Sequence, residues 1–208
     1  SENRGDSWKC ISPELSGNMG PERQGDVPFG TITDISESAL KKGLLYAGTD
    51  DGQVHVTKDD GATWSKINNG LPNKWVSRVV ASKYDEGKVF VSLTGYREDD
   101  FEAYLYVSTD FGETWKSLSN NMPSESINVI REDPTDQDIL YVGTELGAYC
   151  SIDNGKAWYS LCKTLPTCAV HDLALHAGTG DLVAGTHGRS AFVLNTKEIQ
   201  KKKQGIVK

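Results

Sequence analysis

Short runs of alternating apolar and polar residues recur along the chain, and they come in pairs. The second run of each pair covers 45–50, 89–94, 140–145 or 182–187. The first run lies upstream of it, at 31–36, 76–82, 127–131 or 170–176. Alternation with a period of two over four to eight residues is typical of half-buried β-strands. The pattern therefore predicts an all-β chain, and its 21 glycines fit many short strands joined by tight turns.

A turn motif of the form Ser/Thr-x-Asp/Asn-x-Gly-x-x-Trp occurs four times, at 1–8, 57–64, 108–115 and 151–158. We expect its carboxylate or amide to accept bonds from backbone N–H groups, its glycine to take a positive φ, and its tryptophan to anchor a hairpin in the core. These residues are therefore predicted to be structural: Asn3, Gly5, Trp8, Asp59, Gly61, Trp64, Asp110, Gly112, Trp115, Asp153, Gly155 and Trp158.

The four tryptophans of the motif are spaced as one four-stranded β-propeller blade per repeat requires. The spacing predicts blades at about 31–68, 75–119, 127–162 and 169–195. The fourth blade has no turn motif and no fourth strand. Residues 1–12, in contrast, contain a motif and one strand without the three strands that should come before. Residues 196–208 are expected to be a linker or tail, either solvated or forming a short helix.

Two interpretations of the incomplete ends follow. Residues 1–12 form the last strand either of blade four, in a closed four-blade ring, or of a preceding blade. In the second case the chain is the C-terminal part of a larger propeller, which is favoured because the chain begins at the first residue of a motif. A partial ring leaves sheet edges bare, so the missing blades are expected as partners in cis or in trans.

Composition and charge exclude several classes of function. The chain of 208 residues has 22 basic and 29 acidic side chains, a net charge of −7. Nucleic acids and anionic membranes both need a concentrated basic surface, so neither is an expected partner. No apolar run approaches the roughly 20 residues that span a bilayer. Residues 1–8 also lack the features of a signal peptide, so any export signal has been removed or lies upstream.

The repeated motifs resemble the Asp-box, or bacterial neuraminidase (BNR) repeat, of sialidases, xyloglucan-active glycoside hydrolases and the sortilin Vps10 propeller. Residues 30–195 look like the C-terminal propeller of large secreted bacterial proteins that are called glycosyl hydrolase-like or sortilin-like. The likeness is carried by the segments 46–52, 76–79, 131–134, 143–147 and 186–190. The resemblance implies seven or more blades in the parent propeller and a secreted, periplasmic or cell-surface location. It implies no reaction, because such repeats occur on catalytic and non-catalytic propellers alike.

Propellers with this motif generally bind ligands at the rim that holds the hairpins between second and third strands. Polar residues there are Asp50, Thr94, Glu145 and His187, which could either orient a ligand or cap their own turns. A seven-residue insertion, 95–101, adds aromatic side chains to the same rim. The predicted ligand-binding residues are Trp75, Arg78, Tyr96, Arg97, Asp99, His187 and Arg189. Their expected ligand is a glycan or an extended peptide, with Trp75 either stacking on it or plugging the core.

Catalysis receives weaker support. A glycoside hydrolase needs two carboxylates about 5 to 9 Å apart, and no spacing in the sequence singles out a pair. The weak candidates are Asp34, Asp50, Glu145 and Asp172, of which Asp34 and Asp172 could instead pair with Arg78 between blades. No metal site or cofactor is predicted. Cys162 and Cys168 are either a disulfide pair or lone thiols. The favoured function is a non-catalytic binding module, and the alternative is part of a glycan-cleaving enzyme.

Overall fold

The structure, a computed structural model, describes residues 3–17 and 30–205, and the strands form four consecutive antiparallel sheets. Residues 1–2 of the first turn motif and 206–208 of the tail lie outside the described residues. Each sheet is an up-and-down meander, as a propeller blade requires. Blade one contains β1 (Ile32–Glu37), β2 (Leu45–Thr49), β3 (Val54–Thr57) and β4 (Ser65–Lys66); blade two contains β5 (Trp75–Ala81), β6 (Val89–Gly95), β7 (Asp100–Ser108) and β8 (Lys116–Ser117).

Blades three and four follow the same order of strands. Blade three contains β9 (Ile127–Glu132), β10 (Leu140–Thr144), β11 (Ala148–Ser151) and β12 (Tyr159–Ser160). Blade four contains β13 (Val170–His176), β14 (Asp181–Thr186) and β15 (Ala191–Asn195), and the described chain adds no fourth strand to it. The prediction of an all-β propeller segment with four blades is therefore confirmed.

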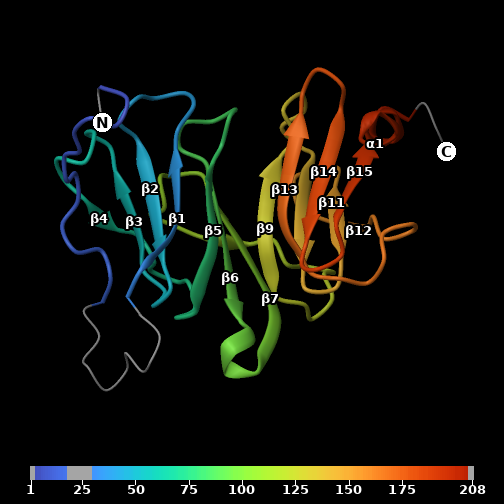
Figure 1. The fold of residues 1–208 in the computed structure, drawn as a ribbon, viewed down its shortest axis with the longest axis horizontal. Helices are drawn as coiled ribbons and strands as arrows, with labels where there is room; N and C mark the ends of the chain where they lie inside the picture. Colours follow the sequence, from blue (N-terminus) through green and yellow to red (C-terminus); the bar gives the residue numbers. More distant parts are fainter. Residues whose placement is uncertain (1–2, 18–29, 206–208) are drawn as a thin grey trace.

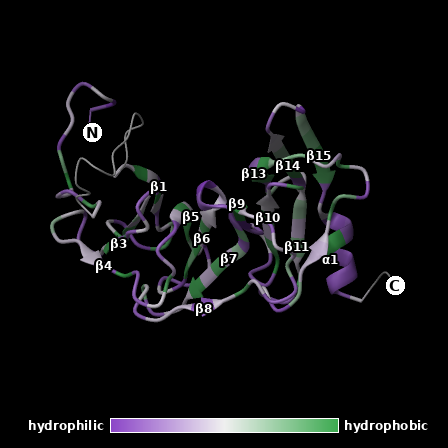
Figure 2. Ribbon diagram, turned by 90° about the horizontal axis from the view of Figure 1, so that it is seen from below, coloured by the Kyte–Doolittle hydropathy of each residue, from purple (hydrophilic) through white to green (hydrophobic). Residues whose placement is uncertain are grey.

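The blades follow one another along an open arc, with the first strand of each blade innermost (Figures 1 and 2). The innermost strands β1, β5, β9 and β13 contact their neighbours in that order. The core is divided among the three junctions between blades, and each apolar cluster combines residues of two adjacent sheets. Residues 3–17 lie at one end of the arc and β15 lies at the other (Figure 1). The N-terminal segment therefore does not close blade four, and the four blades form a partial propeller.

The four turn motifs share one geometry. In blade one, Asp59 accepts a hydrogen bond from the backbone N–H of Thr63 at 2.8 Å, and the hydroxyl of Thr57 donates to the same carboxylate at 2.8 Å. Asn3, Asp110 and Asp153 likewise accept from the N–H group four residues later. The motif glycines have φ values from 82° to 100°, a backbone region that disfavours residues with a Cβ. The motif therefore builds a turn from its own side chains.

The motif tryptophans fasten each blade to the preceding one. The indole Nε1 of Trp115 donates to the carbonyl of Ile67 at 2.7 Å, and that of Trp158 donates to the carbonyl of Leu118 at 2.8 Å. Trp158 is buried and Trp115 is half-buried. The prediction of a core position is wrong for Trp8, whose side chain is 84% exposed. The reason is that no described blade lies in front of the first motif.

The segment after β15 is a short helix, not a solvated linker. Helix α1 (Lys197–Lys203) packs Ile199 against the core between blades three and four. The Lys203 ammonium lies 2.5 Å from Asp136 and 2.9 Å from Asp138, which ties the helix to blade three. Within the described part of the chain, no helix has the length and apolar character to cross a membrane. Cys162 and Cys168 are free thiols.

Candidate ligand-binding site

A cavity of about 460 Å³ opens where the four innermost strands begin, at the rim that also holds the hairpins between second and third strands. We call it the channel-mouth cavity. All four blades and the insertion of blade two contribute to its wall. The lining residues are Thr31, Ile32, Thr33, Trp75, Ser77, Arg78, Thr94, Tyr96, Arg97, Asn128, Glu145 and His171. The sequence placed ligand binding at this rim, and four of its seven predicted binding residues line the cavity: Trp75, Arg78, Tyr96 and Arg97.

A β-bulge at the same position of every innermost strand contributes a polar residue to the cavity. The register between first and second strands shifts by one residue in each blade. The extra residues are Thr33, Ser77, Asn128 and His171, and all four line the cavity. An extra residue re-aims a side chain relative to a regular strand. The bulges therefore create a ring of hydrogen-bonding groups, one from each innermost strand, in the wall of the cavity.

The side chains of these four bulge residues contact either the next blade or their own blade. The Thr33 hydroxyl donates to the carbonyl of Val76 at 2.7 Å, and the Ser77 hydroxyl donates to the carbonyl of Ile127 at 2.7 Å. Each of these hydroxyls thus binds the next blade. Asn128 instead donates its amide to Glu145 at 3.0 Å, within blade three. Sequence analysis did not select Thr33, Ser77 or Asn128. The usable signal was a polar residue at the same position of all four innermost strands, directly after an apolar residue.

Two arginines give the cavity a positive side. The guanidinium carbon of Arg97 lies 4.1 Å from the centroid of the Trp75 ring. Arg97 forms no ion pair with any described residue. Arg78 donates to the carbonyl of His171 at 3.3 Å and lies 3.9 Å from Asp172. Because Arg97 covers one face of the Trp75 ring, the indole and the guanidinium form a single stacked unit in the wall.

The insertion of blade two extends the hairpin between β6 and β7 and is held by contacts of its own. A short 3₁₀ helix, Tyr96–Glu98, forms its tip, and the Phe101 ring meets Tyr96 edge-on at 5.8 Å. Lys74 lies 2.5 Å from Glu98 and 3.0 Å from Asp100. The hydrogen bonds with these two carboxylates raise the pKa of Lys74, and Lys74 in turn lowers the pKa of Asp100. The insertion is therefore held against the start of β5.

The remaining predicted binding residues lie outside the cavity wall. Asp99 is exposed at the tip of the insertion, and Arg189 is exposed after β14. His187 is exposed as well, but its ring contacts His171 edge-on with centroids 5.1 Å apart. His187 therefore lies beside the cavity wall and contacts it through His171, one of the four bulge residues.

The four weak catalytic candidates do not gather in the cavity. Asp50 is buried and accepts three bonds of 2.8 Å from Gly30 and Thr31, so it caps a turn. Asp34 accepts a bond of 2.8 Å from the Val79 N–H, which joins blade one to blade two. Asp172 lies 2.7 Å from Arg131. Only Glu145 lines the cavity. Among the described residues, no three His, Cys, Asp or Glu side chains are grouped closely enough to hold a metal ion.

Comparisons with known proteins agree with this architecture. A family model described as Sortilin-Vps10, "Sortilin, neurotensin receptor 3", matches residues 52–204. The xyloglucanase Xgh74A of Acetivibrio thermocellus is 28% identical over 146 residues, which cover 62% of this chain and 17% of that enzyme. The chain thus spans about a sixth of the length of the curated relatives that it matches.

Solved structures share the fold at low sequence identity. The GH74 enzyme of Niastella koreensis is similar with a TM-score of 0.66 and 14% identity, over 82% of this chain and 29% of the enzyme. YCF48 bound to D1 peptide is similar with a TM-score of 0.55 and 16% identity, over 80% of this chain and 56% of YCF48. These structural likenesses show the β-propeller fold, and together with the family-model match and the xyloglucanase relative they support a sortilin-like and glycoside hydrolase-like β-propeller.

Proposed function

Because the chain belongs to the sortilin Vps10 family, we propose that it is a non-catalytic propeller module that binds an extended peptide or glycan in the channel-mouth cavity. The observation that carries the proposal is the stacked pair of Trp75 and Arg97, which presents an apolar ring and a guanidinium without a carboxylate partner in one wall. Clefts that combine aromatic side chains with a few polar groups are typical of ligand sites.

The charge of the wall favours a peptide over a neutral glycan. The lining contains two cations, Arg78 and Arg97, both from blade two, and its single carboxylate, Glu145, already accepts a bond from Asn128. Guanidinium groups bind carboxylates through paired hydrogen bonds. We therefore expect an extended peptide with an acidic group as the ligand. The complex of YCF48 with D1 peptide supports the ability of a related propeller to bind a peptide.

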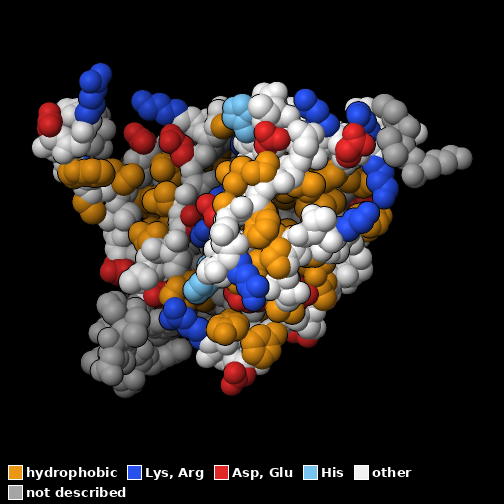
Figure 3. All heavy atoms as spheres, turned by 45° about the vertical axis from the view of Figure 1, so that its right-hand side comes forward, with side chains coloured by type: hydrophobic (Ala, Val, Ile, Leu, Met, Phe, Trp, Pro, Cys, Tyr) orange, Lys and Arg blue, Asp and Glu red, His pale blue; other side chains and the backbone are white. Residues whose placement is uncertain are grey.

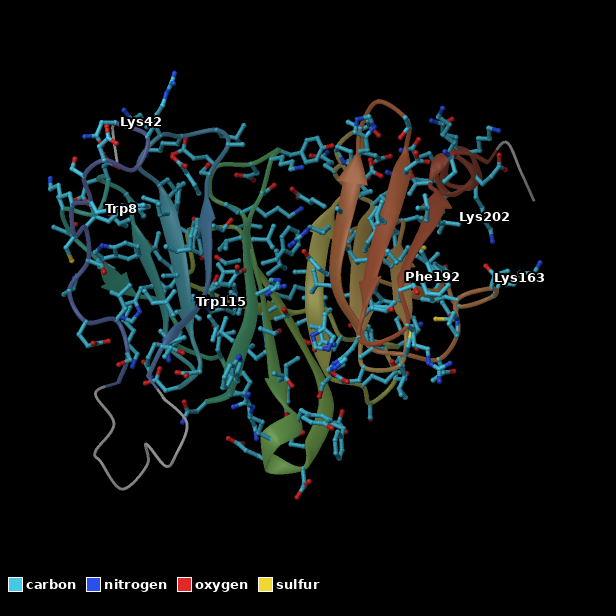
Figure 4. The ribbon with its side chains drawn as sticks, in the orientation of Figure 1. Trp8, Lys42, Trp115, Lys163, Phe192 and Lys202 are labelled. Atoms are coloured by element: carbon cyan, nitrogen blue, oxygen red, sulfur yellow. The ribbon has the colours of Figure 1, made fainter. Side chains whose placement is uncertain are left out.

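The test is a binding assay on the intact chain. The probes are an array of hexapeptides in which one or two Asp or Glu residues move along a Gly/Ser sequence, together with xyloglucan oligosaccharides. We expect acidic peptides to bind and Arg97→Ala and Arg78→Ala each to weaken that binding at least tenfold. Lys163→Ala, an exposed cation near blade four (Figure 4), is the matched control. Binding unaffected by both arginine variants, or no binding to either class of probe, would overturn the proposal.

A second function, as part of a glycan-cleaving enzyme, is favoured by the xyloglucanase relative. A glycosidase built on this cavity would use Glu145 as one of its two carboxylates, and the described wall offers no second one. Release of reducing sugars from xyloglucan distinguishes the two functions. Release that disappears in Glu145→Gln would support the enzyme and contradict the non-catalytic proposal. A secreted, periplasmic or cell-surface location belongs to the same proposal, and fractionation of the source cells tests it.

A further inference from the structure

The insertion of blade two exposes two aromatic side chains beside the channel-mouth cavity. Tyr96 lines the cavity and is 55% exposed, whereas Phe101 lies outside its wall and is 47% exposed. The two rings meet edge-on, with their centroids 5.8 Å apart, and we call this pair the aromatic ledge. In Figure 3, hydrophobic side chains lie open at the insertion, which is the lowest part of the described chain in Figure 1. The ledge therefore continues the wall of the cavity outward.

Polar contacts beneath the ledge hold its backbone. Asp100, an ion-pair partner of Lys74, accepts a hydrogen bond from the Tyr104 hydroxyl at 2.8 Å. It also accepts one from the Glu102 N–H at 3.1 Å. Glu102 in turn accepts a bond of 3.1 Å from the hydroxyl of Ser124, which lies just before β9, so the insertion is tied to blade three as well as to its own blade. Contact area that is ordered in advance costs less entropy when a ligand covers it.

The fold of a blade does not require these two rings. The corresponding hairpins are short in blade one, from Thr49 to Val54, and in blade three, from Thr144 to Ala148. Neither hairpin contains a Phe, Tyr or Trp residue. Aromatic side chains that stay half in water gain free energy when a ligand covers them. The ledge is therefore better explained by a ligand than by packing within the propeller.

Charge changes sign along the insertion. On the side of the cavity, the guanidinium of Arg97 stacks on Trp75. At the tip, Asp99 is exposed, and the described part of the chain places no cation within ion-pair distance of its carboxylate. Glu98 beside it is exposed too, although Lys74 is its partner. The aromatic ledge thus belongs to a surface with a basic end in the cavity and an acidic end at the tip.

We propose that the aromatic ledge binds a large apolar side chain of the same extended peptide whose acidic group binds Arg97, and that Asp99 binds a basic side chain of that peptide. The inference rests on the proposed function, because the acidic group anchors the peptide in the cavity. A ligand that complements the charges of this surface presents acidic, apolar and basic groups in that order. Side chains two residues apart on an extended chain share one side and lie about 6.6 Å from each other. This step is comparable to the 5.8 Å between the ring that lines the cavity and the ring that does not, so the expected pattern is Asp-x-Phe-x-Lys or its reverse.

Fluorescence anisotropy of labelled peptides mixed with the intact chain tests the proposal. The peptides share one Gly/Ser sequence and carry Asp alone, Asp-x-Phe, Asp-x-Phe-x-Lys, or the last pattern in reverse. We expect the Phe side chain to raise the affinity of the Asp peptide at least tenfold. The Lys side chain should raise it at least threefold more in one of the two orders, since only one order places the cation at the tip of the insertion.

Two variants, checked for folding by circular dichroism, separate the contributions. Phe101→Ala should remove the gain from Phe and leave the affinity of the Asp peptide unchanged, because Phe101 lies outside the cavity wall. Asp99→Asn should remove only the gain from Lys, and asparagine tolerates the φ of 56° at this position. Tyr159→Ala is the matched control, since it removes a ring that is 52% exposed on β12, at the outer edge of blade three, and should change none of the affinities.

The outcomes distinguish this proposal from the function on which it rests. An Asp peptide that binds without any gain from Phe, or a gain that survives Phe101→Ala, would overturn the role of the ledge and leave the proposed function intact. A gain from Lys that is absent in both orders, or that survives Asp99→Asn, would overturn the role of Asp99. If Phe101→Ala weakened the binding of xyloglucan oligosaccharides and not of peptides, the ledge would belong to a sugar and the proposal would be wrong. No binding by any of the peptides would overturn both proposals.

Discussion

The guanidinium carbon of Arg97 lies 4.1 Å from the centroid of the Trp75 ring, and this contact joins the insertion of blade two to its innermost strand. Arg97 comes from the hairpin after β6, whereas Trp75 is the first residue of β5. The contact therefore fixes both the position of the insertion and the direction in which the arginine faces the cavity. One cation–π pair thus serves the fold and the proposed binding site.

Loss of this pair should have a small and measurable cost. We expect Arg97→Ala to lower the free energy of unfolding by about 0.5–1 kcal/mol, the usual worth of an exposed cation–π contact. Arg189→Ala removes an exposed arginine that lines no cavity and should change it by less than about 0.5 kcal/mol. Urea denaturation followed by circular dichroism provides the measurement. Equal effects of the two variants would contradict a stabilising role of the stack.

A motif tryptophan should contribute to stability only where its indole is buried and bonded to the preceding blade. Trp158→Phe leaves the carbonyl of Leu118 without its donor at a buried site, so the expected loss is about 1–3 kcal/mol. Trp8→Phe alters the same motif position where the ring is exposed, and the expected change is within about 0.5 kcal/mol. Urea midpoints of the two variants decide between these outcomes.

Two buried tyrosines should respond in opposite directions. The Tyr141 hydroxyl donates to Asp133 at 3.0 Å, whereas the buried Tyr46 hydroxyl has no hydrogen-bond partner among the described residues. Tyr141→Phe removes a hydrogen bond to a buried carboxylate and should cost about 1.5–3 kcal/mol, and Tyr46→Phe removes an unsatisfied group and should be neutral or stabilising. Thermal unfolding of both variants checks the contrast. A Tyr46→Phe variant that is the less stable of the two would refute it.

The turn of blade two should make stability depend on acid pH. Hydrogen bonds from the hydroxyls of Ser108 and Thr114 lower the pKa of Asp110 to about 2, from 3.8 for a free side chain. A depressed pKa adds stability that is fully present above the unfolded value and is lost as the pH falls through the folded value. We expect Asp110→Asn to flatten the decline of stability between about pH 4 and pH 2. A carboxyl NMR titration of Asp110 measures the pKa directly, and a midpoint near 3.8 would exclude this contribution.

The sequence was sufficient for the strand order because each element carries a local pattern. The alternation of 45–49 and the turn at 57–64 each reflect contacts within one hairpin. The location of the binding rim followed from the same order, and four of the seven selected residues line the cavity. Local patterning thus determines the blade and the rim to which its hairpins belong.

Other features depend on contacts between distant parts of the chain. Asp50 was a weak candidate for a catalytic carboxylate, but it accepts hydrogen bonds from Gly30 and Thr31, about 20 residues earlier. Trp8 has the motif of a core residue, and its exposure reflects the lack of a described blade in front of it. The bulges that expose Asn128 and His171 leave one trace in the sequence, a polar residue at the same position of each innermost strand, and that trace does not by itself predict a bulge. Such features are fixed by partners that a local pattern does not identify.

The bonds of the motif tryptophans all point in one direction along the chain. Trp64, Trp115 and Trp158 donate to carbonyls 53, 48 and 40 residues earlier, and none donates to a residue that comes later. During synthesis, the acceptor for each indole has therefore left the ribosome before its donor does. Each new blade can be fastened to a finished surface as soon as its own turn emerges. The arc can in this way be assembled vectorially, one blade at a time, in the order in which the blades leave the ribosome.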